Sequence, residues 1–343
     1  MNIKLIICSL LISITSASFS QTNTSNISLI KKTIIGGDGS WDYVSVSEQD
    51  RRVYASHTNQ VEVLNIDTHE KIGTITNTQG VHGICALPKI GKGYTTNGKT
   101  NTVSVFDIKT LKVISEIAVG DGPDALLYDE FTKQLFIFNN DGKTVSIINV
   151  VTDKLIKTFE VGGSPEAGVS NNKGLIYLNL EDTNEIVVID AKTLAVVKRF
   201  SLAPGIKPTG LAIDIKTNRL FSVCRKSQLM LVVNAIDGVI VAQLPIGKGV
   251  DGVVFDASNN IAVASNWEGT FTVVKQMPND KFEVIDNVKT ETGARTIAID
   301  NTTHHLFTIT AQYGEPPAAT KENPRPRAPI VANTFMLLEY GKK

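Results

Sequence analysis

The fold is decided by the stretch GDGPDALLYDEFTKQLFIFNNDGKTVSIINVVTDKLIKTFEVG, residues 120–162. It contains four short runs rich in apolar and β-branched residues, and Asn, Asp, Gly, Thr and Lys separate each run from the next. β-Branched and aromatic runs of this length, bounded by turn residues, are typical of strands. The stretch therefore predicts four antiparallel strands joined by tight turns.

The same order of strands and turns recurs along the chain. The run that corresponds to LFIF is found at residues 52–55, 93–96, 135–138, 175–178, 220–223, 261–264 and 306–309. A second marker of each repeat is the residue that follows the Pro, or its equivalent, at the start of the first strand, such as Asp124 after Pro123. The spacings between successive markers are 40, 42, 42, 43, 42 and 44 residues. Seven repeats with four strands each predict an all-β, seven-bladed β-propeller.

The two ends of the chain are expected to complete one blade. The seventh repeat stops after its third strand, whereas residues 28–35 resemble the fourth strand of other repeats, such as residues 112–120. An N-terminal strand that pairs with the last blade closes the ring and removes an open sheet edge.

The first residues predict export. Lys4 precedes the apolar run 5–14, and Ser18-Phe19-Ser20 has the form of a cleavage site. We expect residues 1–20 to be a signal peptide and the protein to be periplasmic or secreted. Residues 21–343 are then one propeller domain, with blades that start near residues 36, 80, 121, 163, 206, 249 and 293.

Composition excludes several classes of function. The chain of 343 residues has 34 Lys+Arg and 34 Asp+Glu, so no excess of positive charge favours nucleic acid. No further apolar run is long enough to span a membrane, no CxxCH motif attaches haem, and Cys85 and Cys224 are expected to be buried free thiols. Residues 93–100 match a phosphate-binding loop, but they join two antiparallel strands, so we expect no nucleotide. We expect a monomer.

Two runs carry a resemblance to a known family. NTVSVFD (residues 101–107) and KTVSIIN (residues 143–149), with a Gly-x-x-Pro pattern before the first strand, resemble the YVTN-type repeat of YncE-like bacterial β-propellers. The resemblance covers nearly all of the mature chain. The last two repeats depart from the family pattern, because Lys275 replaces the usual Asp or Asn and a long insertion occurs. It implies a seven-bladed propeller outside the cytoplasm and no single activity.

The second marker supplies the candidate metal site. Because it lies at the start of the innermost strand, one such residue per blade is expected to face the central channel. The ring has a formal charge of −3 and consists of Asp42, His82, Asp124, Glu166, Thr209, Asp251 and Arg295. Clustered carboxylates repel one another, so we predict a divalent cation (Ca²⁺, Mg²⁺, Mn²⁺ or Zn²⁺) on Asp124, Glu166, Asp251 and His82. The alternative is a solvated polar channel mouth.

Loops on the same face supply candidate ligand-binding residues. With two ring members they form a polar rim that suits a small polar molecule such as a sugar, and the set is Asp42, Thr209, Asn97, Asn139, Glu181, Arg225, Trp267 and Tyr313. The insertion at residues 312–333 contains five prolines, Arg325 and Arg327, and we expect it to cover the channel mouth as a lid.

Two functions remain open at this point. In the first, the propeller binds a metal ion, a small polar ligand or a partner protein at the channel mouth. In the second, it is a metal-assisted lactonase, hydrolase or lyase, with His82 as general base and Arg295 stabilising developing negative charge.

Overall fold

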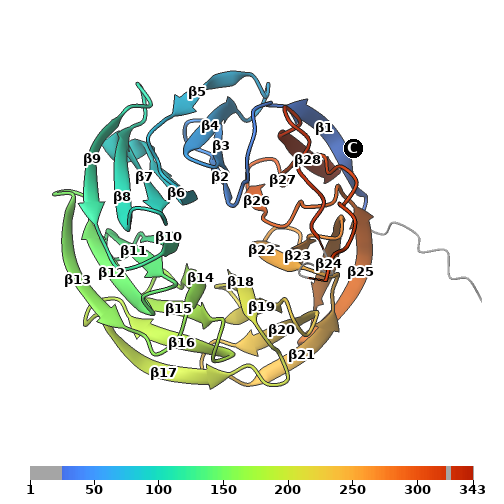
Figure 1. Cartoon of the computed structure of the whole chain (residues 1–343). Helices are drawn as coiled ribbons and strands as arrows, with labels where there is room; N and C mark the ends of the chain where they lie inside the picture. Colours follow the sequence, from blue (N-terminus) through green and yellow to red (C-terminus); the bar gives the residue numbers. More distant parts are fainter. Residues whose placement is uncertain (1–24, 322–325, 343) are drawn as a thin grey trace, which may run out of the picture.

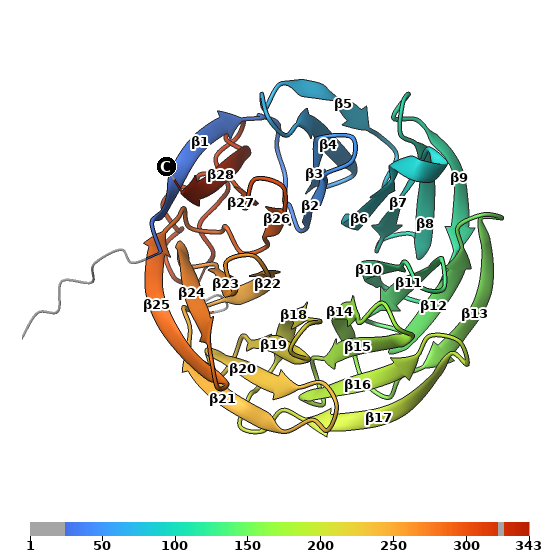
Figure 2. The same cartoon turned by 180° about the vertical axis from the view of Figure 1, so that it is seen from behind.

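The computed structural model describes residues 25–321 and 326–342, and in these residues seven four-stranded antiparallel sheets form a closed ring (Figures 1 and 2). The predicted seven-bladed propeller is confirmed. The predicted signal peptide lies outside the described residues. Among the described residues, the one helix is the short 3-10 turn η1 (Pro88–Ile90), and none is long and apolar enough to cross a membrane.

The strands of each blade run from the channel outward, as the order of the sheets shows. The innermost strands are β2 (Val44–Ser47), β6 (Val81–Leu87), β10 (Pro123–Asp129), β14 (Pro165–Ser170), β18 (Pro208–Asp214), β22 (Val250–Asp256) and β26 (Ala298–Asp300). The second strands are β3 (Arg52–His57), β7 (Lys92–Asn97), β11 (Gln134–Asn139), β15 (Leu175–Leu180), β19 (Arg219–Cys224), β23 (Ile261–Asn266) and β27 (His305–Thr310).

The third and fourth strands complete each blade. The third strands are β4 (Gln60–Asn65), β8 (Thr102–Asp107), β12 (Thr144–Asn149), β16 (Glu185–Asp190), β20 (Leu229–Asn234), β24 (Thr270–Met277) and β28 (Met336–Lys342). The outermost strands are β5 (Lys71–Ile75), β9 (Val113–Ala118), β13 (Lys154–Glu160), β17 (Ala195–Ser201), β21 (Ile240–Pro245), β25 (Lys281–Lys289) and β1 (Ile27–Ile34).

The core lies between neighbouring blades rather than at one centre. One apolar cluster, for example, joins Phe136 and Phe138 of β11 to Ile176 and Leu178 of β15. The second and third strands are buried on both faces, while strands such as β13 are mostly exposed. Strands covered on both sides read as nearly continuous apolar runs, which is why LFIF-type runs mark every repeat so clearly.

The ring is closed by the N-terminal strand, as predicted. β1 pairs antiparallel with β28, with Ile27 opposite Lys342 and Thr33 opposite Leu337. The chain entering β1 is fixed to the sixth blade, because the Ser25 hydroxyl donates a hydrogen bond of 2.6 Å to the buried carboxylate of Asp286.

A buried polar cluster holds this blade against the first one. Both carboxylate oxygens of Glu339 on β28 are engaged: His305 Nδ1 lies 2.7 Å from one, and His69 Nε2, from the first blade, lies 3.1 Å from the other. His69 also pairs with Thr33 of β1 at 2.8 Å. Burial acts to raise the pKa of Glu339, but its two histidine partners hold that pKa below the ordinary value.

Several smaller expectations are met or corrected here. Asp129 accepts a hydrogen bond of 2.9 Å from Thr132 N, as Asp side chains commonly do in turns. Of residues 93–100, residues 93–97 belong to β7 and residues 98–100 to the turn before β8, so the sequence match to a phosphate-binding loop is a strand and its turn. Neither Cys85 nor Cys224 forms a disulfide, but Cys85 is only half-buried, because β6 is an inner strand beside the channel.

Deleting residues 27–34 is expected to open the seventh blade. The unpaired edge of β28 then offers free backbone groups to another chain, so the truncated protein should aggregate or unfold without cooperativity. Size-exclusion chromatography and thermal unfolding measure this. A truncated protein that stays monomeric with an unchanged melting curve would contradict closure by β1.

Glu339→Gln is expected to lower the free energy of unfolding by about 2 kcal/mol near pH 7, since a buried charged hydrogen bond is lost. A carboxylate with a lowered pKa stabilises the fold above its ordinary pKa and loses this effect as the pH falls. The difference between the two proteins should therefore shrink below pH 4. Urea unfolding at several pH values tests it, with the exposed Glu283→Gln as control. An equal loss at every pH would contradict it.

Candidate functional site

The starts of the innermost strands converge on a large cavity at one mouth of the channel. Its volume is about 880 Å³, and Asp42, Asp124, Glu166, Asp251 and Arg295 all line it. A second cavity of about 580 Å³ adds His82 and shares Asp42, Asp124, Glu166 and Arg295 with the first. Six of the seven ring residues predicted from the sequence thus meet at one place. The seventh, Thr209, is 1% exposed and lies between the inner strands, so it is not available to a ligand.

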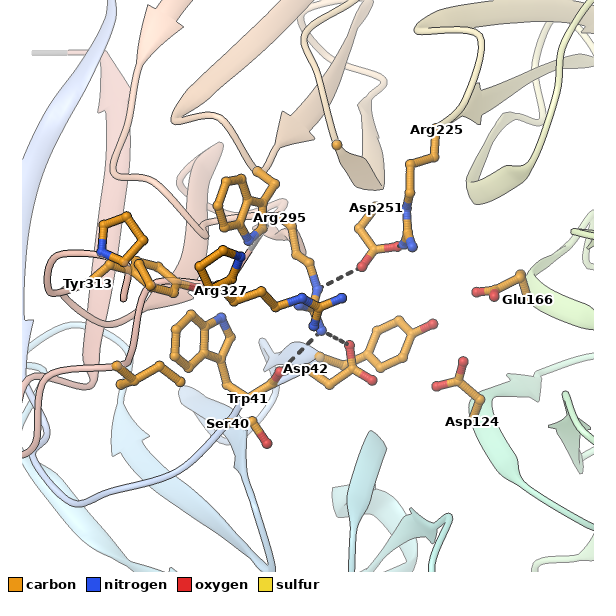
Figure 3. Close-up of a pocket in the computed structure, with 17 residues that line it drawn as sticks. Ser40, Trp41, Asp42, Asp124, Glu166, Arg225, Asp251, Arg295, Tyr313 and Arg327 are labelled. Carbon is orange, nitrogen blue, oxygen red and sulfur yellow. Dashed lines mark hydrogen bonds and ion pairs between the residues drawn. The ribbon is translucent and has the colours of Figure 1, made fainter. Parts of the chain in front are cut away.

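Arginines neutralise one half of the ring. Arg295 bridges two carboxylates, with its Nε 2.8 Å from Asp251 and its Nη2 3.1 Å from Asp42 (Figure 3). Arg225, at the end of the second strand of its blade, forms a further ion pair with Asp251. Asp251 is therefore less available as a metal ligand than predicted, because its carboxylate already pairs with two guanidinium groups.

Asp42, rather than Asp251, lies beside His82. His82 Nδ1 lies 2.5 Å from Asp42 Oδ2 and 3.4 Å from Asp124 Oδ1. Among the described residues, Asp42, His82 and Asp124 form a group whose potential ligand atoms lie within 4.8 Å of one another. Of the predicted metal ligands, the cluster contains His82 and Asp124 and lacks Glu166 and Asp251. It includes Asp42, which the sequence predicts as a ligand-binding residue instead.

The charges in this half depend on one another. Burial acts to raise the pKa of Asp42, but its contacts with His82 and Arg295 lower it below the ordinary value. Burial acts to lower the pKa of His82, but Asp42 and Asp124 raise it. Burial and the neighbouring Asp42 raise the pKa of Asp124 to about 7.

Glu166 is the most perturbed acid of the ring. Burial, together with the charges of Asp124 and Glu181, raises its pKa to about 9. Among the described residues, Asn140 Nδ2 donates a hydrogen bond of 3.2 Å to its carboxylate. Glu166 therefore favours its neutral form at pH 7, so the ring is less negative than its formal charge.

Aromatic side chains form one wall of the larger cavity. The ring of Tyr313 lies 6.1 Å from that of Trp41 and 5.7 Å from that of Trp267. Trp267 is 42% exposed, whereas Trp41 is almost completely buried. Three predicted ligand-binding residues, Trp267, Tyr313 and Arg225, thus line the cavity together with Asp42.

The insertion between β27 and β28 covers this wall. Its base is ordered, because Tyr313 and Ile330 form a β-bridge and Gly314 N donates to Pro329 O over 2.8 Å. Pro316, Pro326 and Arg327 then line the cavity, so the loop does lie over the channel mouth. Arg325 lies outside the described residues.

Three predicted ligand-binding residues lie elsewhere. Asn97 and Asn139 are fully buried in their hairpins, where each amide donates to a Thr and a Ser of the next strand. Both therefore fasten a turn and cannot reach a ligand in this conformation. Glu181 is half-buried and pairs with Lys207 at 3.1 Å, outside both cavities.

Tyr43 lines the cavity from the first blade and is not among the residues predicted from the sequence. Burial and the charges of Asp124 and Glu166 raise its pKa well above the ordinary value. A sequence pattern could have found it. The residue after the marker is Gly, Ala or Thr in the six other repeats, and only the first repeat has a large side chain there.

Comparison with known proteins agrees with the fold. Residues 30–174 match a family model described as YNCE-like beta-propeller. The match covers most of β1 and the first three blades, and it confirms the resemblance to YncE-like propellers over this part of the chain. None of the curated proteins matches the chain.

Glu166→Gln is expected to stabilise the protein in alkaline solution. A carboxyl group whose pKa is raised in the folded state destabilises the fold as the pH rises from its ordinary pKa towards the raised one. Glutamine cannot ionise, so the melting temperatures should be similar at pH 5 and differ by a few degrees at pH 9, in favour of the variant. Differential scanning calorimetry measures both, with the exposed Glu160→Gln as control. A constant difference across this range would refute the assignment.

Proposed function

We propose that this YncE-like β-propeller is an exported binding protein that holds a small polar ligand and a divalent cation at its channel mouth. The propeller fold supports a binding or scaffold role in general. The observation that carries the proposal is the cavity of about 880 Å³, into which the first, third, fourth, fifth, sixth and seventh blades all contribute polar side chains. Small-molecule sites commonly have volumes of about 300–1,000 Å³.

Asp42, His82 and Asp124 are the residues proposed to hold the cation. Their ligand atoms lie within 4.8 Å of one another, and Asp124 Oδ1 is buried without a hydrogen-bond partner among the described residues. Two carboxylates and one imidazole suit Mn²⁺ or Zn²⁺, and Ca²⁺ or Mg²⁺ with further oxygen ligands. A bound cation would favour the ionised form of Asp124, which burial and Asp42 now oppose.

A metal-assisted lactonase, hydrolase or lyase is the second candidate. The pKa of Asp124, about 7, favours it because a carboxyl group that titrates near neutral pH can exchange protons with a substrate. Arg295 argues against it. Its guanidinium already pairs with Asp42 and Asp251, so it is not free to stabilise a developing negative charge. We therefore rank binding first.

Cation binding is expected to be measurable by isothermal titration calorimetry with Ca²⁺, Mg²⁺, Mn²⁺ and Zn²⁺. The best of these should raise the melting temperature, since it binds only the folded protein. Asp124→Asn should weaken binding about 10-fold or more, and affinity should rise from pH 6 to pH 8 because the cation displaces protons. The matched control is Asp141→Asn, a carboxylate of the smaller cavity that is not part of the cluster. Equal binding by both variants, or none by the wild type, would refute the cation site.

A further inference from the structure

The indole of Trp41 carries a donor that the protein leaves unused. Trp41 is 6% exposed and lines both cavities, and its Nε1 is buried without a hydrogen-bond partner in the described part of the chain. Trp267, on the same wall, packs against Tyr313, with ring centroids 5.7 Å apart. A buried indole N–H that lacks a partner costs free energy, so one aimed at a ligand cavity calls for an acceptor on the ligand.

Arg327 supplies a positive charge at the same end of the cavity. It lines both cavities, and no ion pair of this side chain is seen among the described residues. In Figure 3 the side chain extends from the insertion over the cavity that Arg295 and Trp41 also line. Its charge is therefore available to a bound molecule.

The other charged side chains at the Trp41 end of the cavity neutralise one another. Arg225 and Arg295 are matched by Asp42 and Asp251, with which they form ion pairs. Arg327 thus leaves one surplus positive charge beside an unused N–H donor. This combination suits a monoanion whose oxygens accept hydrogen bonds, and a carboxylate has both properties. A phosphate dianion carries more charge than the surplus and would face the carboxylates of Asp42 and Asp251. A quaternary ammonium group would be repelled by Arg327.

The remaining lining suits a hydroxylated ring. Trp41, Trp267 and Tyr313 offer flat apolar surfaces, while Asp124 and Glu166 offer hydrogen-bonding groups from the other side of the cavity. A ligand with one carboxylate and several hydroxyl groups satisfies both sides.

We propose that the ligand of the channel mouth is a small sugar acid, whose carboxylate accepts a hydrogen bond from Trp41 Nε1 and pairs with Arg327. This inference rests on the proposed function, because it names the chemical class of the ligand that the cavity holds.

Intrinsic fluorescence reports on this cavity alone. The chain contains two tryptophans, and both line it. The probes are glucuronate, galacturonate and gluconate, each titrated beside its neutral counterpart (glucose, galactose and sorbitol), together with choline and inorganic phosphate. Each titration is run with Ca²⁺ and again after EDTA, which separates ligand binding from the cation site.

At least one sugar acid should change the fluorescence with an affinity 10-fold or more above that of its neutral counterpart. Arg327→Gln and Trp41→Phe should each weaken acid binding about 10-fold, since each removes a hydrogen bond to a charged group. Both variants should weaken the binding of the neutral sugar much less than that of the acid, because the neutral sugar has no carboxylate to pair with Arg327. Trp267 still reports in the second variant. The control is Arg219→Gln, which removes a surface ion pair with Asp280 on another part of the ring.

The outcomes separate the two proposals. Equal affinity for acid and neutral sugars would overturn the sugar-acid assignment and leave small-ligand binding in place. Tighter binding of choline or of phosphate, or acid binding that ignores Arg327→Gln and Trp41→Phe, would overturn it as well. No fluorescence change with any probe, with or without Ca²⁺, would count against the binding function itself and so against both proposals.

Discussion

The structure depends on the burial of both faces of every blade. A four-stranded sheet with apolar residues on both sides cannot be stable alone, and here each apolar cluster lies between two neighbouring blades, as in the one that joins Phe138 to Leu178. A row of such blades leaves two apolar faces at its ends unless it closes on itself. The pairing of β1 with β28 and the contacts of Glu339 with His69 and His305 are the places where this requirement is met.

Closure also determines what the channel can hold. The inner strands of seven blades crowd around one axis, and a Cβ atom on Gly210 would lie 2.8 Å from the carbonyl oxygen of Asp251 on the next blade. Six of the seven blades accordingly have Gly, Ala or Thr one step along the strand from the marker position, whereas the first blade has Tyr43. Six of the seven marker side chains line the cavities at the mouth of the channel, which brings acids and bases from distant parts of the sequence within ion-pair distance. Arg295 contacts Asp251 and Asp42 in this way.

The features that could be predicted from the sequence are those that repeat from blade to blade. Strands, turns and the closing strand recur with the period of the blades, so they were predictable. Asn97 and Asn139 also recur at one hairpin position, and a residue type that repeats at one turn indicates turn chemistry rather than a ligand site. Tyr43 was not predicted, because it lies beside the marker position rather than at it. The pairing of Asp251 with Arg225 was not predictable, because it depends on how far a side chain reaches between blades.

The charge of the mouth is the clearest case in which sequence arithmetic falls short. A count gives the ring three surplus negative charges, yet burial keeps Glu166 near its neutral form and two arginines neutralise Asp251. Asp42 connects the two halves, since one of its oxygens lies 2.5 Å from His82 and the other 3.1 Å from Arg295. A change of charge beside His82 therefore alters how strongly Asp42 holds Arg295, and through Arg295 it alters the charge balance around Asp251. The acidic half and the arginine half of the mouth consequently cannot respond to ligands or protons independently.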